Sequence, residues 1–182
     1  QVHVPLEADK EGGITQEPSF WNLFGQAVEV PSGAEVELQD TAGMLSPLYP
    51  DRFLQKVMLG QGKDPDQARK AFSALQDWQD QDQLHRLNGA EAWSYRAEAL
   101  PYVPRNSYVQ TISELKLILG FQPDLFQNIQ DKLIFWPARS RNYLTMSPEL
   151  LRFAISDQEA VERVLELRRQ NSLTVKLFTW LT

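Results

Sequence analysis

The stretch DPDQARKAFSALQDWQDQDQLHRLNGAEAWSY, residues 64–95, predicts a helix that runs directly into an acidic loop. Asp64 suits the N-cap position, and Pro65 suits the first helical position because no backbone N–H donor is needed there. Apolar residues then recur at three- and four-residue steps, which gives the helix one apolar face. These residues are Ala68, Ala71, Phe72, Leu75 and Trp78.

The acidic loop carries carboxylates in a pattern that suits a hard cation. Asp77, Asp80 and Asp82 fall within six residues, and Glu91 follows nine residues after Asp82. Ca²⁺ prefers several oxygen ligands, and clustered carboxylates supply them. Without a cation, bringing these acids together costs like-charge repulsion. The loop is therefore a candidate calcium site.

The spacing does not fit an EF-hand. Asp80, Asp82 and Glu91 occupy positions 1, 3 and 12 of a twelve-residue window, as EF-hand ligands do. Leu84 and His85 occupy positions 5 and 6, where an EF-hand needs an oxygen ligand and a glycine. A calcium loop of another geometry stays open.

Two other interpretations of the acidic loop also stay open. The acids can simply end the helix on a solvated face, with Arg86 as a partial counter-charge. They can also act as paired carboxylates in glycoside hydrolysis, although spacing alone does not supply the separation that this chemistry needs. Nearby aromatic residues can stack on a sugar, but we expect them to pack in the core and anchor the loop. These aromatic residues are Trp78, Trp93, Tyr95 and Tyr102.

Patterns on either side of this stretch predict a small sheet interrupted by helices. Alternation in residues 26–40 around Pro31-Ser32-Gly33 predicts a hairpin, and residues 172–181 predict a further strand. Residues 83–110 lack periodicity, so we expect a long ordered loop there. The expected helices are 51–59 closed by Gly60, 64–79, 111–120, 124–130, 147–154 and one capped by Ser156 with Glu159. This order predicts an α+β fold in which a large helical insertion interrupts a small antiparallel sheet.

The composition excludes several classes of function. The formal net charge of −6 disfavours a nucleic-acid partner, because phosphate contacts need a basic face. The absence of cysteine excludes disulfides, thiolate nucleophiles and cysteine-ligated zinc. No apolar run approaches the length that spans a bilayer. His3 and His85 are the two histidines, and neither lies in a nucleophile motif; no phosphate-binding loop is present.

An ordered series of motifs between residues 77 and 120 resembles the K-type minor pseudopilins of type II secretion systems. The segments VELQDTAGMLSPLYPDRF (36–53) and NYLTMSPELLRFAI (142–155) are similar to flanking segments of that family. The matching residues of the central series are Asp77-Trp78, Asp80, Asp82, Arg86, Gly89-Ala90-Glu91, Tyr95, Pro101-Tyr102, Arg105-Asn106, Ser113-Glu114-Leu115 and Gly120.

The resemblance implies a pilin-like fold with a large helical domain inserted into it. Residues 1–44 and 171–182 would form the pilin-like α/β part, and residues 45–170 the inserted domain with the acidic loop. The resemblance also implies calcium as the cofactor, bound by Asp80, Asp82 and Glu91 with Asp77 as a further or supporting residue. The family commonly has an acidic residue where this chain has Ala92, so the resemblance does not carry a second calcium site.

The implied function is structural and not enzymatic. The resemblance implies a tip component of the secretion pseudopilus, which helps to initiate assembly with other minor pseudopilins and supports export of folded proteins. It places the protein at the periplasmic face of a Gram-negative inner membrane, anchored by a single N-terminal apolar helix that is missing from this sequence. A type IV pilus minor pilin with the same helical insert is one alternative. A carboxylate-based periplasmic glycan hydrolase is the other.

Overall fold

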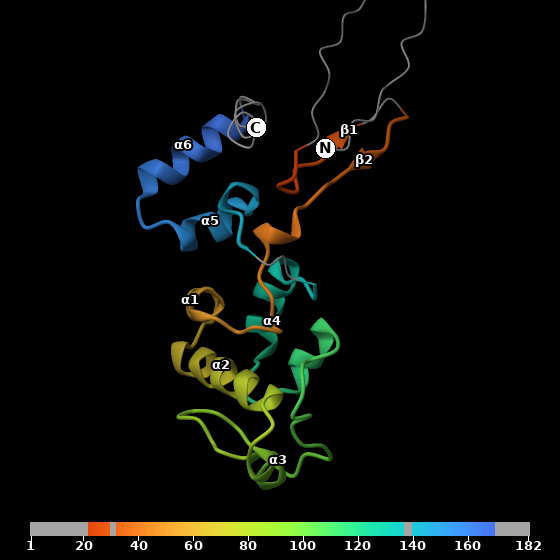
Figure 1. Cartoon of the computed structure of the whole chain (residues 1–182), viewed down its shortest axis with the longest axis vertical. Helices are drawn as coiled ribbons and strands as arrows, with labels where there is room; N and C mark the ends of the chain where they lie inside the picture. The colour runs from red at the N-terminus through yellow and green to blue at the C-terminus, as the bar shows by residue number, and fades with distance from the viewer. Residues whose placement is uncertain (1–21, 30–31, 137–139, 170–182) are drawn as a thin grey trace, which may run out of the picture.

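The chain folds into an elongated, mostly helical molecule with one small hairpin near one end (Figure 1). The computed structural model describes residues 22–29, 32–136 and 140–169. The hairpin and α6 lie at one end of the long axis and α3 at the other (Figure 1). The helices are α1 (Arg52–Gln61), α2 (Pro65–Gln79), α3 (Ala92–Ala97), α4 (Pro123–Ile129), α5 (Pro148–Ala154) and α6 (Gln158–Arg169). The described 3₁₀ helices are η1 (Thr41–Gly43), η2 (Ile112–Leu117), η3 (Gln130–Lys132) and η4 (Tyr143–Thr145).

The predicted hairpin is present. Strands β1 (Val28–Glu29) and β2 (Glu35–Val36) pair antiparallel, with Val28 opposite Val36. Gly33 lies between them with a φ of +78°, a conformation that glycine adopts without steric cost. The further strand predicted at residues 172–181 lies outside the described residues, so the interrupted sheet stays a prediction.

Helix α2 begins as the sequence predicts. The Asp64 side chain accepts hydrogen bonds from the backbone N–H groups of Asp66 and Gln67, and Pro65 opens the helix. Asp51 caps α1 in the same way, through the N–H groups of Phe53 and Leu54. These caps satisfy N–H donors that have no partner within the helix.

Three predicted helix boundaries are wrong. The helix predicted at residues 111–120 is the 3₁₀ helix η2, which ends at Leu117 and not at Gly120. Helix α1 continues through Gly60 to Gln61, and its C-cap is Gly62. A Cβ at Gly60 would lie 2.3 Å from the ring of Phe153 in α5, so this glycine permits close helix packing and does not end the helix. Helix α6 is capped by Asp157, whose side chain accepts from Glu159 N, and not by Ser156.

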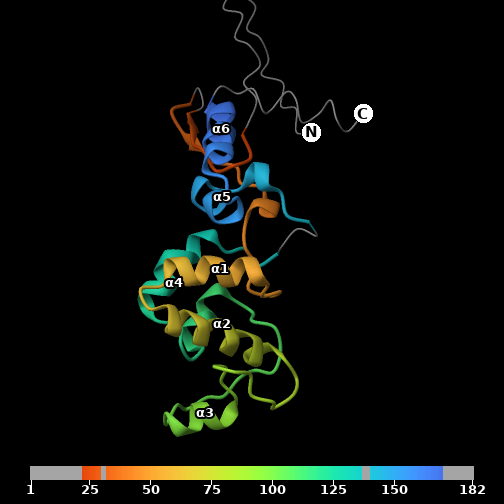
Figure 2. The ribbon, with the colours of Figure 1, turned by 90° about the vertical axis from the view of Figure 1, so that its left-hand side faces the viewer.

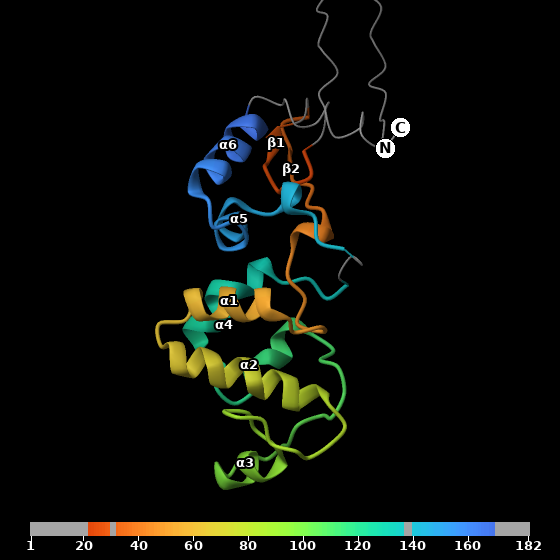
Figure 3. The ribbon, with the colours of Figure 1, turned by 60° about the vertical axis from the view of Figure 1, so that its left-hand side comes forward.

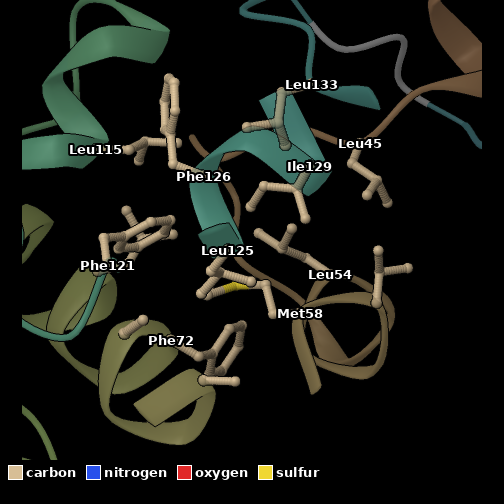
Figure 4. Close-up of a cluster of buried hydrophobic side chains, with 14 of the residues drawn as sticks. Leu45, Leu54, Met58, Phe72, Leu115, Phe121, Leu125, Phe126, Ile129 and Leu133 are labelled. Carbon is tan, nitrogen blue, oxygen red and sulfur yellow. The ribbon is translucent and has the colours of Figure 1, made fainter. Parts of the chain in front are cut away.

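The core forms where α1, α2 and α4 pack together. Leu54 and Met58 of α1 face Phe72 of α2 and Leu125 and Ile129 of α4 (Figure 4). All five side chains are buried, and burial of each contributes roughly 1.5–3 kcal/mol. Figure 2 shows α1 lying over α2, with α5 and α6 stacked beyond them toward the hairpin end.

A hydrogen-bonded junction joins the hairpin end to the returning chain. The Asp40 carboxylate accepts hydrogen bonds from Asn142 Nδ2 at 3.1 Å and from Thr145 Oγ1 at 2.9 Å. A Cβ at Gly43 would lie 2.4 Å from the carbonyl oxygen of Thr145, so only glycine allows this close backbone approach. Arg168 of α6 donates to the carbonyl oxygen of Met146 at 2.7 Å and holds α6 on the same junction.

The sequence predicts a continuous loop at residues 83–110, but the structure contains a helix within this segment. The segment contains α3, a helix of only six residues in which Tyr95 is the buried member. One buried position in so short a helix produces no periodic signal, which explains the error. In the part of the chain that the structure describes, no helix combines the length and apolar character needed to cross a membrane.

Candidate functional site

Three carboxylates converge where α2 ends and α3 begins. Asp77 lies in the last turn of α2, Asp80 is its C-cap, and Glu91 is the N-cap of α3. One carboxylate oxygen from each lies within 4.8 Å of the others. We call these three residues the acid cluster. The two helices that carry it, α2 and α3, lie in the half of the molecule away from the hairpin (Figure 3).

Burial removes most of the acid cluster from water. Asp77 and Glu91 are 0% exposed, and Asp80 is half-buried. Among the described residues, neither carboxylate oxygen of Glu91 has a hydrogen-bond partner, and the same holds for Oδ1 of Asp80. An ionised carboxylate buried in this way costs several kcal/mol unless a donor or a cation satisfies it.

The electrostatics of the acid cluster oppose ionisation of Glu91. Burial first, and then the neighbouring charges of Asp77, Asp80 and Asp82, together raise the pKa of Glu91 to about 7. A carboxylate with such a pKa is only partly ionised at neutral pH. A nearby cation would reverse this effect and favour the charged form.

Arg86 supplies one positive charge to the cluster. Its Nη1 donates to Asp77 Oδ1 at 2.7 Å and also to Asp80 Oδ2, and its backbone N–H donates to Asp77 Oδ2 at 3.3 Å. These two carboxylates raise the pKa of the Arg86 guanidinium above its ordinary value. One guanidinium therefore faces three carboxylates, and it does not reach Glu91.

The donor set fits a hard divalent cation. All three side chains offer carboxylate oxygens, which Ca²⁺ prefers. Glu91 brings two oxygens without partners among the described residues, and Asp80 brings one. A calcium ion takes six to eight oxygen ligands, so backbone carbonyls or water would complete the shell. The chemistry of the residues thus fits a hard divalent cation, and calcium stays a prediction.

A family model described as "Type II secretion system (T2SS), protein K" matches residues 37–138. The chain belongs to this family. The matched range includes the whole acid cluster and the core helices α1, α2 and α4.

Relatives in this family are similar over part of their length. A type II secretion system protein K from Klebsiella pneumoniae is 35% identical over 81 residues, which are 44% of this chain and 25% of that protein. The protein K of Pectobacterium carotovorum subsp. carotovorum is 33% identical over 81 residues, with the same two coverages of 44% and 25%. The alignment thus spans a quarter of the length of these relatives.

The fold is similar to a solved structure from a type 2 secretion system. A chain in the crystal structure of the GspK-GspI-GspJ complex from enterotoxigenic Escherichia coli matches with a TM-score of 0.55. The match covers 71% of this chain and 52% of that chain, at 18% sequence identity. At this identity the likeness shows the fold alone.

Of the four predicted ligands in this member of the protein K family, three converge and one does not. Asp80, Glu91 and Asp77 converge, and Asp77 is central because both its oxygens accept from Arg86. Asp82 is not among the three residues whose oxygens converge. Its side chain is exposed and accepts a hydrogen bond from Leu84 N at 2.7 Å, so its role as a ligand stays a prediction.

Gly89 makes room for the acid cluster. A Cβ at this position would lie 2.0 Å from Asp77 Oδ2, which excludes any side chain while Asp77 keeps its place. The same backbone donates from Gly89 N to the carbonyl oxygen of Arg86 at 2.8 Å and closes the turn that carries Arg86. This explains the glycine that precedes Glu91 in the sequence.

Aromatic residues of α2 and α3, the two helices at the acid cluster, pack against each other. Trp78 and Tyr95 have ring centroids 5.6 Å apart, and each contacts Tyr102. Trp78 and Tyr95 are buried, which confirms the expected core role for these two. Trp93 differs, because it is 59% exposed and its ring lies 5.3 Å from that of His85.

Sequence reasoning noted Glu114 in a motif but gave it no role. Its carboxylate accepts from Trp78 Nε1 at 2.9 Å, Arg105 Nε at 2.7 Å and Gln110 N at 2.9 Å. Burial raises the pKa of Glu114, but these donors outweigh burial and hold it below its ordinary value. Glu114 thereby ties the segment after α3 to the end of α2. Arg105 and Glu114 both lie in the motif, and their opposite charges are the signal that could have suggested this ion pair.

With a chelator present, we expect the protein to lose stability as the pH rises from about 5 to about 7.5. Folding raises the pKa of Glu91 from 4.5 to about 7, so the folded state keeps a proton that the unfolded state releases. This stabilisation is complete below the unfolded pKa of 4.5 and is lost as the pH passes through the folded value of about 7. The full loss is about 3 kcal/mol, measurable by denaturant unfolding in EDTA.

Glu91→Gln is the matched variant, because it removes the charge and keeps the size of the side chain. Its free energy of unfolding should change little over that pH range and should exceed that of the wild type at about pH 7.5. A parallel loss of stability in both proteins would contradict the assignment of this pH dependence to Glu91.

Proposed function

We propose that this chain is the periplasmic part of a minor pseudopilin, a non-enzymatic component of the tip of a type II secretion pseudopilus. Membership of the protein K family supports this role, and so does the fold shared with a chain of the GspK-GspI-GspJ complex. The partners would be other minor pseudopilins, with which it initiates assembly for protein export. The full-length protein would be held at the periplasmic face of the inner membrane by an N-terminal apolar helix.

We propose the predicted domain division on the same grounds. Residues 1–44 and 171–182 would form the pilin-like part, and residues 45–170 the helical insertion. The Asp40–Thr145 hydrogen bond joins the two proposed parts at the hairpin end. Within the proposed insertion α5 packs on α1, and Arg168 of α6 lies over the ring of Phe24 in the proposed pilin-like part.

The unpaired burial of Glu91 is the observation that supports a calcium site. Asp77, Asp80 and Glu91 would hold the ion, with Asp82 as a further candidate ligand. A bound cation would supply the positive charge that Arg86 alone does not provide. Because Asp77 and Asp80 belong to the end of α2 and Glu91 to the start of α3, binding would hold these two elements together.

The same burial weakens the glycan hydrolase alternative. Asp77 and Glu91 are 0% exposed, so neither carboxylate can reach a glycosidic bond in a polymer. A glycosidase needs both of its carboxylates at the substrate. The type IV pilus alternative concerns the machine that the protein serves, and the match to the protein K family supports the type II system.

Calcium should bind the purified chain and raise its melting temperature. Isothermal titration calorimetry should show wild-type binding, and Asp77→Asn should weaken it at least about tenfold, because affinity depends on the charge of the ligands. Asp66→Asn is the matched control, since it removes one negative charge from the exposed start of the same helix. Absence of heat together with an unchanged melting temperature in calcium would contradict the site.

The purified chain should also co-elute with other minor pseudopilins of its own organism in size-exclusion chromatography. The major pseudopilin alone is the control and should elute separately from it. Separate elution from every minor pseudopilin, tested singly and in mixtures, would contradict the assembly role and would leave the calcium result unaffected.

A further inference from the structure

Arg86 occupies positions that a bound cation would need. Its Nη1 hydrogen bonds take one oxygen of Asp77 and one of Asp80, two of the three members of the acid cluster. A divalent cation binds through the same carboxylate lone pairs. A guanidinium and a divalent cation at the same oxygens would also repel each other.

The charges show why Arg86 is an incomplete substitute. One guanidinium contacts two carboxylates and leaves Glu91 without a partner among the described residues. A divalent ion carries twice the charge of a guanidinium in a smaller volume, and it can be coordinated by oxygens of all three acids. Exchange of Arg86 for such an ion would therefore satisfy Glu91, which Arg86 does not reach.

We propose that Arg86 is the exchangeable counter-cation of the acid cluster, which holds Asp77 and Asp80 when calcium is absent and withdraws when calcium binds. This inference rests on the calcium site proposed above. It assigns Arg86 two opposing effects: it stabilises the metal-free loop, and it lowers the affinity for calcium.

Space for the withdrawn side chain exists beside the cluster. Arg86 and Asp80 also line a surface groove of about 590 Å³, together with Tyr49, Asn106 and Tyr108. The Arg86 side chain is already 42% exposed, so its guanidinium can remain hydrated after it leaves the acids. Tyr49 and Tyr108 are exposed, and a guanidinium can stack on an aromatic face. Withdrawal therefore requires no rearrangement of the core.

The exchange has a consequence for the conditions under which the protein works. In a site of three carboxylates without Arg86, like-charge repulsion would loosen the loop whenever calcium was scarce. With Arg86 present, the end of α2 stays connected to the turn that carries Arg86 through the ion pair with Asp77. The loop thus stays folded before calcium arrives, at the cost of weaker binding.

Calorimetry on Arg86→Gln in the full chain tests the exchange. We expect calcium to bind about tenfold more tightly than to wild type, equivalent to about 1.4 kcal/mol, because no resident cation has to leave. The melting temperature in EDTA should fall, because Asp77 and Asp80 lose their counter-charge. Arg96→Gln is the control: it removes an exposed positive charge from neighbouring α3, and in the described residues Arg96 forms no ion pair with the acids.

Arg86→Lys covers the case in which Arg86→Gln does not fold without calcium. It keeps the charge, so its calcium affinity and its stability in EDTA should stay near those of wild type. Wild-type binding with weaker binding by Arg86→Gln would overturn the exchange, because Arg86 would then position the ligands. Absence of calcium binding by wild type would overturn the calcium site, and the exchange with it.

Discussion

The buried carboxylate of Glu91 is the constraint on which this end of the molecule depends. It is 0% exposed, neither oxygen has a partner among the described residues, and two further carboxylates lie beside it. A folded domain rarely keeps such an arrangement, because its cost is a sizeable share of a domain's stability. Either Glu91 holds a proton or a cation lies among the acids. Both states follow from the same geometry, and the supply of calcium would select between them.

The surrounding structure is organised to keep these acids together. Trp78 of α2 packs against Tyr95 of α3, and Glu114 accepts a hydrogen bond from Trp78, which connects the segment after α3 to α2. Gly89 leaves the volume that Asp77 fills. The acid cluster is thus a product of the core, because the same α2 helix contributes Phe72 to the core and Asp77 to the cluster. The packing of α2 against α3 thus holds α3 at the end of the molecule away from the hairpin, where its surface is exposed.

Local signals in the sequence predicted much of this fold, and long-range contacts account for the errors. Asp64 and Pro65 mark the start of α2 because capping depends on neighbouring residues alone. The predicted end of α1 at Gly60 was wrong, because the role of Gly60 is set by Phe153, which lies far along the chain. The sequence spacing identified the acidic residues, but spacing does not show which way each side chain points. It therefore did not show that Asp82 would bond to its own turn. The pairing of Arg86 with two of the acids, and the isolation of Glu91, depend on how the loop folds back on α2.

A crystal structure of the chain grown with calcium, with an anomalous difference map, tests the central claim most directly. The account predicts a peak bonded to oxygens of Asp77, Asp80 and Glu91 at calcium–oxygen distances of about 2.3–2.6 Å, with Arg86 Nη1 withdrawn from both aspartates. A map without a peak at the acid cluster, in which Arg86 still bridges Asp77 and Asp80 and Glu91 remains unpaired, would contradict it.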